Sequence, residues 1–275
     1  MRTTGKRVKK KTLLHVRTRH PSHSILRKNP LLRTFGKKIL LRLGSTTAIN
    51  GVRPYDLEIN SVEGIRNSSD KLKMKKCFET AKVAQCYWFT LRPNGTFWKK
   101  GIDGEENTSS EEMHFPIIAK GRFGSRGRAN TKIDNLEELT AWLKKPNLTL
   151  SNYIFELYFN GSREYRLHVS KNGCFYTNRK LRNNDSEERW FFNNLNCAWM
   201  LETNPTFNKP PTWDQIVADC VEALDAIGLD LGAFDVRTDK AGDWRIIEVN
   251  SAPSFGEITS TKYIEELNKI IQEHK

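Results

Sequence analysis

The sequence has few cysteines, and nothing in their spacing joins them. Its five cysteines are scattered along 275 residues, are odd in number and include no Cys-x-x-Cys pair. This argues against a disulfide framework or a structural zinc site and indicates a reducing compartment, which we expect to be the cytoplasm. The sequence also lacks an apolar run long enough to span a membrane, and its start lacks the pattern of a secretion signal.

Acidic residues are missing from the first 44 positions, which carry fourteen Lys and Arg. The remainder holds thirty-one basic and thirty-two acidic residues, so the net charge of +13 comes from the start of the chain. Residues 1–38 show little apolar periodicity, and we expect a mostly disordered basic arm there. Such an arm would bind nucleic acid or another polyanion, or would serve only as a solubilising tail. The histidines of the arm have no metal-binding partners and are expected to be solvated: His15, His20 and His23.

Hydrophobic periodicity predicts an α+β protein. We expect strands at 39–43, 55–59, 87–91 and 115–120, a loop over 101–112, and helices at 70–81, 134–145, 213–227 and 261–274. Ser68 or Ser69 is the expected N-cap of the first of these helices, and Thr212 with Gln215 forms a capping box at the third. Three further strands, at 152–159, 164–169 and 174–178, are joined by short turns and predict one antiparallel sheet.

Two β-rich runs near the end of the chain flank Asp239–Asp243, whose composition favours a turn. They predict a hairpin. If Asp239 pairs with Trp244, then Arg237 faces Ile246.

In that register Asp235 also faces Glu248, and Asn250 lies on the same side of the hairpin. Opposed residues have Cβ atoms roughly 4.5–5.5 Å apart, so the two carboxylates need a cation between them, or one must bind a proton. With the amide of Asn250 the donor set is all oxygen, which suits Mg²⁺. The alternative is an exposed acidic hairpin without a metal.

A second polar stretch combines glycine with arginine. The strand that ends at Lys120 runs into Gly121–Arg128, whose backbone N–H groups and guanidinium groups could bind phosphates. It is no Walker A loop, because no Gly-Lys-Ser/Thr opens a helix after it. A surface turn is the alternative. Lys71 opens the helix at 70–81, where the helix dipole disfavours a cation unless an anion approaches; here the alternative is a solvated lysine.

In this order and spacing, the parts resemble the ATP-grasp superfamily of carboxylate–amine ligases. The resemblance lies in Ser69–Lys71, Pro116–Lys120, Gly124–Gly127 and Glu248–Pro253, and it extends from about Ile39 to the C-terminus. It looks closest to a compact branch found in phage genomes, related to D-Ala-D-Ala ligases, which would place the protein in a host cytoplasm. The implied organisation has four parts: a basic arm at 1–38, an abbreviated N-terminal segment at 39–66, a subdomain with the glycine-rich loop at 67–152, and a subdomain with the magnesium hairpin at 153–275.

The resemblance also implies roles for individual residues around a nucleotide held between the two subdomains. Lys71 and Lys120 would contact the phosphates of ATP, beneath a loop that contains Gly124, Ser125 and Gly127. The backbone from Glu156 to Tyr158 would bind adenine, and Glu164 would bind the ribose hydroxyls. Asp235, Glu248 and Asn250 would hold Mg²⁺.

The implied reaction joins a carboxylate to an amine through an acyl phosphate and releases ADP. It depends on positioning and charge neutralisation more than on a protein nucleophile. Three arginines are candidates for holding the carboxylate or the acyl phosphate: Arg126, Arg166 and Arg179. The expected substrates are small molecules or peptides, or groups associated with nucleic acid.

One position departs from the family pattern. Many members place an arginine two residues before the metal aspartate, and this sequence has Ala233 there. The role would pass to Arg237 or to the glycine-rich loop, or the protein would bind ATP and turn over poorly. The alternative function is a nucleic-acid-binding protein whose body binds nucleotide or is catalytically inert.

Overall fold

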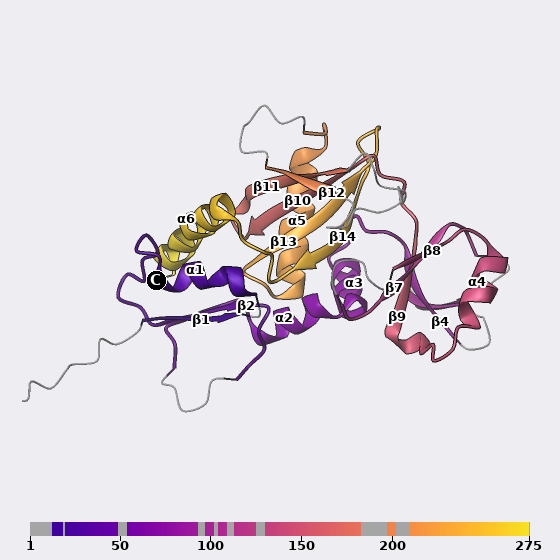
Figure 1. Ribbon diagram of the computed structural model, residues 1–275, viewed down its shortest axis with the longest axis horizontal. Helices are drawn as coiled ribbons and strands as arrows, with labels where there is room; N and C mark the ends of the chain where they lie inside the picture. The colour runs from indigo at the N-terminus through magenta and orange to yellow at the C-terminus, as the bar shows by residue number, and fades with distance from the viewer. Residues whose placement is uncertain are drawn as a thin grey trace, which may run out of the picture.

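The computed structural model describes residues 13–18, 20–48, 54–92, 97–101, 104–108, 113–124, 130–182, 197–201 and 209–274. In the strands at 97–101, 104–108 and 197–201, and at Lys28 and Arg182, only the backbone is described. These residues form three β-sheets with helices packed on them (Figure 1). No helix within the described ranges has the length and hydropathy that a membrane span requires.

The first sheet is parallel and has the order β1-β2-β3, from β1 (Leu14–Thr18), β2 (Ile39–Leu43) and β3 (Leu57–Ile59). Between β1 and β2 lie the 3-10 helix η1 (Pro21–His23) and α1 (Ser24–Lys28). Leu26 of α1 is fully buried in a core that this sheet shares with α6 (Glu257–Glu273), seen beside α1 in Figure 1.

The expectation of disorder up to residue 38 is therefore wrong from residue 13 onward. Val16 and Leu26 supply apolar contacts to the core, and β1 gains a complete hydrogen-bonded partner in β2. These contacts offset the entropy of ordering a basic segment. Residues 1–12 lie outside the described part of the chain.

The second sheet has the order β6-β5-β4-β9-β7-β8. Its strands are β4 (Trp88–Leu91), β5 (Phe97–Gly101), β6 (Gly104–Thr108), β7 (Ile117–Gly121), β8 (Thr131–Ile133) and β9 (Tyr153–Leu157). Helix α4 (Leu136–Leu143) packs on one face, where Leu139 and Trp142 meet Phe89 and Phe155. The alternate residues, among them Lys120 and Glu156, therefore occupy the other face. The expectation of a loop over 101–112 is wrong for residues 104–108, which form β6.

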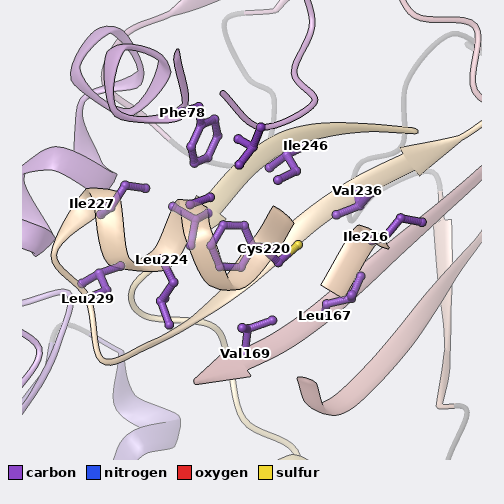
Figure 2. Packing of buried hydrophobic residues seen from close by; sticks show 14 of the residues in the cluster. Phe78, Leu167, Val169, Ile216, Cys220, Leu224, Ile227, Leu229, Val236 and Ile246 are labelled. Carbon is purple, nitrogen blue, oxygen red and sulfur yellow. The ribbon is translucent and has the colours of Figure 1, made fainter. Parts of the chain in front are cut away.

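The third sheet is antiparallel, with the order β12-β11-β10-β13-β14. Its strands are β10 (Arg163–Ser170), β11 (Gly173–Arg182), β12 (Cys197–Leu201), β13 (Leu231–Thr238) and β14 (Trp244–Asn250). Three helices cover one face: α2 (Val62–Ser69), α3 (Lys71–Thr80) and α5 (Trp213–Ile227). Figure 2 shows Ile216, Cys220 and Leu224 of α5 packed among Leu167, Val236 and Phe78. The opposite face of this sheet carries charge.

The predicted three-stranded sheet over 152–178 is wrong in its first strand. β9 pairs with β4 and β7 in the second sheet, while β10 pairs with β11 and β13 in the third. The segment between β9 and β10 does not turn back on β9, because the Ser162 N–H donates to the Thr238 carbonyl at the end of β13, 2.8 Å away. Residues 158–162 thus carry the chain from one sheet to the other.

Three predicted helix starts also change. Ser68 and Ser69 end α2, and the cap of α3 is Asp70, whose side chain accepts the Leu72 N–H at 3.0 Å. Thr212 makes no capping box, because its hydroxyl donates to the Gly242 carbonyl at 2.6 Å and so holds the β13–β14 turn against α5. Helix α6 begins at Glu257, about one turn before the predicted start.

Candidate nucleotide and metal site

The β13–β14 hairpin brings Asp235 directly opposite Glu248, as the sequence predicts. The turn is longer than expected, since Thr238 and not Asp239 pairs with Trp244, and Arg237 faces Arg245. Asp239 closes a five-residue turn by accepting the N–H groups of Gly242 and Asp243 on its side chain, both at 2.9 Å. A bulge next to Asp235 absorbs the one-residue offset and restores the carboxylate pair.

Asp235 is buried and ion-paired with two cations. Arg166 on β10 binds it with two bonds of 2.7 Å, from Nε to Oδ1 and from Nη2 to Oδ2. Lys180 on β11 places Nζ 3.0 Å from Oδ2. Burial alone would raise the pKa of Asp235, but the charges of Arg166 and Lys180 outweigh it and hold the pKa well below its usual range.

Glu164 extends this group of charges along β10. Its carboxylate accepts from Lys180 Nζ through Oε1 and from Arg237 Nε through Oε2, the latter at 2.8 Å. Lys180 therefore contacts Glu164 and Asp235 at once. We call these five side chains, drawn from three neighbouring strands, the ionic network: Glu164, Arg166, Lys180, Asp235 and Arg237.

Glu248 and Asn250 lie beside the ionic network, each half-buried on β14. Asn250 Nδ2 donates to Glu248 Oε1 at 3.3 Å, which confirms that the two share a face. Burial lowers the pKa values of Arg166 in the third sheet and Lys120 in the second, but their ion pairs raise them above the usual range, and the Glu248 charge adds to this rise. Glu248 thus lies near cations of both sheets.

A second buried cluster lies between the second sheet and α3, and Met74 of α3 accepts the N–H of Val249, the residue after Glu248, at 3.4 Å. Lys120 Nζ on β7 lies 2.7 Å from Glu156 Oε2 on β9, and Lys75 Nζ on α3 lies 3.3 Å from Glu156 Oε1. Lys75 is 0% exposed, and sequence reasoning missed it. Its spacing of four residues from Lys71, which places both lysines on one side of the helix, was the available signal.

The start of α3 is tied to the glycine-rich loop. Lys71 Nζ donates to the Gly124 carbonyl at 3.3 Å, and the Lys71 N–H donates to the Arg122 carbonyl at 3.1 Å. Arg122 in turn binds Asp70 through two bonds of 3.1 and 2.6 Å. The structure therefore brings Lys71 and Gly124 together. The expected phosphate ligands Ser125 and Gly127, and the catalytic candidate Arg126, fall outside the described residues.

The expected adenine segment is partly engaged within the protein. The N–H groups of Leu157 and Tyr158 donate to the carbonyls of Tyr87 and Pro116, each at 2.9 Å. The Glu156 side chain is held by the two lysines described above. Any backbone contact to adenine from 156–158 would have to come from other groups of this segment.

Arg179 lies on the face of the third sheet opposite to the ionic network. It pairs with Tyr165, which is buried against α5, whereas Arg166 pairs with Asn178. Because side chains alternate along a strand, Arg179 lies on the face opposite to Arg166. The neighbouring Lys180 lies on the face where Arg179 was expected. Alternation along β11, together with the pairing of β10 with β11, could have identified Lys180.

Ala233 is buried between His168 and Asn250 in the strand register. Arg237, one of the candidates for the role of an arginine at this position, donates from Nε to Glu164 in this structure. The cations on Asp235 are Arg166 and Lys180.

The donor chemistry of Asp235, Glu248 and Asn250 fits a magnesium ion, since all three offer oxygen. Within the described ranges no three His, Cys, Asp or Glu side chains are grouped to hold a metal, so the amide oxygen of Asn250 must complete the set. For an ion to use Oδ2 of Asp235, the ammonium of Lys180 would have to move away from it.

Models of known protein families and curated protein sequences give no match to this sequence. Solved structures do. D-alanine–D-alanine ligase from Bacillus anthracis in complex with ATP matches at a TM-score of 0.56 and 12% identity, over 92% of this chain and 85% of that one. The ATP-grasp ligase PsnB in complex with a minimal precursor matches at 0.53 and 14%, over 79% and 63%.

Biotin carboxylase from Campylobacter jejuni matches at a TM-score of 0.57 and 16% identity. The match covers 85% of this chain and 54% of that one, so this protein spans about half of the length of that enzyme. At identities of this level the likeness shows the fold. The three sheets with their helices form the α+β architecture that these structures share, and the protein has the ATP-grasp fold.

Proposed function

We propose that the protein is an ATP- and Mg²⁺-dependent ligase that forms a C–N bond and releases ADP. The observation that carries the proposal is that α3 joins two charged groups, because Lys75 lies 3.3 Å from Glu156 and the preceding Met74 accepts the Val249 N–H next to Glu248 at 3.4 Å. The ionic network with Glu248 and Asn250 comes from the third sheet, and Lys75, Lys120 and Glu156 come from the second sheet and α3. PsnB has been solved with Mg and ADP, in the same fold.

In this proposal Lys71, Lys75 and Lys120 bind the phosphates of ATP, and the loop at Gly124 covers them. Glu164 binds the ribose hydroxyls. Asp235, Glu248 and Asn250 would hold Mg²⁺, which neutralises charge on the phosphoryl group during its transfer. Arg166 binds Asp235 through Nε and Nη2, so its contact to the acceptor carboxylate would come from Nη1. Arg179, which pairs with Tyr165 on the other face of the sheet, has no role in this proposal.

The chemistry follows from positioning. The acceptor carboxylate oxygen attacks the γ-phosphorus, ADP leaves, and an acyl phosphate results. An amine then attacks the acyl carbon and phosphate leaves, giving the amide. The proposed substrates are a small-molecule or peptide carboxylate and an amine, a choice supported by the D-alanine–D-alanine ligase and by the minimal precursor bound to PsnB.

The test is ADP release with mixed carboxylates and amines, with and without Mg²⁺. Glu248→Gln keeps the size of the side chain, removes its charge and is expected to lower Mg²⁺-dependent ADP release at least about a hundredfold. Glu265→Gln, on the exposed surface of α6, is the matched control and should leave the rate unchanged. Full activity in Glu248→Gln would refute the assignment of the metal site.

A further inference from the structure

Lys180 has an arrangement that the proposed chemistry does not use. Its ammonium contacts Glu164 Oε1 and lies 3.0 Å from Asp235 Oδ2, and the residue is only 6% exposed. It therefore bridges the carboxylate proposed for ribose and a carboxylate proposed for the metal. Its ammonium is held by a carboxylate of β10 and by a carboxylate of β13.

A divalent ion that binds Asp235 meets this ammonium at the same oxygen. Two cations within about 4 Å of each other repel strongly in a partly buried site. Either Lys180 or Arg166 must therefore give way when a metal takes an Asp235 oxygen. The two are not equivalent competitors.

Arg166 is the harder of the two to displace. Its guanidinium makes two parallel bonds of 2.7 Å to Asp235, which a planar fork holds in fixed geometry. Lys180 makes one bond of 3.0 Å to Asp235 from a flexible stem. If it moves, its charge stays compensated by Glu164. Lys180 is thus the cation that yields.

We propose that Lys180 is a positioning residue that competes with the divalent metal for Asp235 and so sets the metal affinity of the site. The inference rests on the proposed function, because it takes Asp235 as a metal ligand. It follows that the protein alone binds metal weakly. Nucleotide phosphates, which add oxygen ligands, make metal binding favourable despite the competition.

The experiment measures the affinity of the purified full-length protein for Mn²⁺ by electron paramagnetic resonance, without nucleotide. Lys180→Met should bind Mn²⁺ about ten- to a hundredfold more tightly than the wild type, the range that one hydrogen bond between charged groups is worth. Lys180→Arg keeps a cation at the position and should return affinity towards the wild-type value. Each carboxylate keeps one cation in Lys180→Met, since Arg166 remains on Asp235 and Arg237 on Glu164.

Arg237→Met is the matched control. It also removes one positive charge from the ionic network, but this charge is bonded to Glu164, so any general electrostatic gain in Mn²⁺ affinity appears in both variants. A larger gain in Lys180→Met than in Arg237→Met supports direct competition. Equal gains, or no Mn²⁺ binding by Lys180→Met, would overturn the inference. Lys180→Gln is measured alongside, so that poor folding of one variant does not decide the result.

Failure of the proposed function gives a different result. In that case Mn²⁺ does not bind the wild type even with ATP, or it binds Glu248→Gln equally well. Tight binding with ATP that depends on Glu248, together with equal affinities of Lys180→Met and Arg237→Met, would reject only the role of Lys180.

Discussion

The ring of His23 links the N-terminal segment to the loop that follows β14. Its Nε2 lies 2.6 Å from the Pro253 carbonyl, Thr18 Oγ1 lies at its Nδ1, and its ring centroid is 4.4 Å from that of Phe255. The carbonyl can only accept, so Nε2 carries a proton and donates to it. His23 is fully buried, and burial lowers its pKa from 6.5 to about 4. The expectation that it is solvated is wrong.

Because the pKa of His23 is lower in the folded protein, the unfolded protein takes up the proton first as the pH falls. The stabilisation is complete above about pH 6.5 and is lost between pH 6.5 and 4, by up to about 3 kcal/mol. Urea unfolding of wild type and His23→Gln at pH 7.5 and 4.5 should therefore show a weaker pH dependence in the variant. Burial also lowers the pKa of His168, and this adds the same pH dependence of stability to both proteins. The exposed His274→Gln is the control. Equal pH dependence in His23→Gln and wild type would refute this role.

At this scale the sequence predicts residues that are related by alternation along neighbouring strands. Asp235, Glu248 and Asn250 follow from one hairpin, and the bulge leaves their pairing intact. Lys75 lies on a helix, and the predicted strand at 174–178 ends before Lys180, so alternation within the predicted strands reaches neither lysine. Each of these lysines is buried beside a carboxylate on another element that compensates its charge. The partner is Glu156 for Lys75 and Glu164 for Lys180, and only the assembled sheets reveal these partners.

At the scale of elements, α2 crosses the end of α5 with a close backbone contact. A Cβ on Gly64 would lie 2.1 Å from the Gly228 carbonyl oxygen. Ser61 Oγ donates to the same oxygen at 3.1 Å, and Asn67 Nδ2 donates to the Ile227 carbonyl at 3.2 Å. The start and the middle of α2 are therefore fixed on the C-terminal end of α5, where Gly228 adopts a φ of 82°.

We predict that Gly64→Ala destabilises the protein by about 1–3 kcal/mol, because the added methyl group pushes α2 away from α5. This would outweigh the gain of up to about 1 kcal/mol that alanine brings to a helix. Gly256→Ala is the matched control, since nothing lies within 4 Å of its Cβ position. Chemical denaturation measures both. A Gly64→Ala protein as stable as the wild type would contradict the tight crossing.

Helices with strong periodicity were predictable, and α5 ends at Gly228 as expected. The sequence could not show which strands pair over long distances. β9 looks like the first strand of a meander and instead lies between β4 and β7, and β1 pairs with a strand more than twenty residues later. Thr212 illustrates the same limit, because its hydroxyl finds a tertiary partner in place of the predicted cap.

At the scale of the whole molecule, the basic start of the chain divides into two parts. Residues 13–38 contribute β1 and α1 to the core under α6, whereas residues 1–12 carry six Lys and Arg and no acidic residue. A polyanion-binding role is thus best tested on residues 1–12. Removing 1–38 would also remove Val16, His23 and Leu26 from the core.

We expect a deletion of residues 1–12 to leave the unfolding midpoint unchanged and a deletion of 1–38 to lower it strongly. If the segment binds nucleic acid, the shorter deletion weakens binding and reduces the slope of log affinity against log salt by up to about five. Titrations of single-stranded and duplex DNA at several salt concentrations measure this. If deletion of residues 1–12 leaves DNA binding unchanged, this segment is not a nucleic-acid site.

The most direct test of the central claim is thermal unfolding with and without ATP and Mg²⁺, on the wild type and on Glu248→Gln. A ligand at a hundred times its Kd adds about 2.7 kcal/mol, which moves the midpoint of a protein of this size by several degrees. The nucleotide and metal site that we propose predicts a rise in the wild type that requires Mg²⁺ and is lost in Glu248→Gln. An unchanged midpoint at saturating ATP and Mg²⁺ would contradict nucleotide and metal binding between the two sheets.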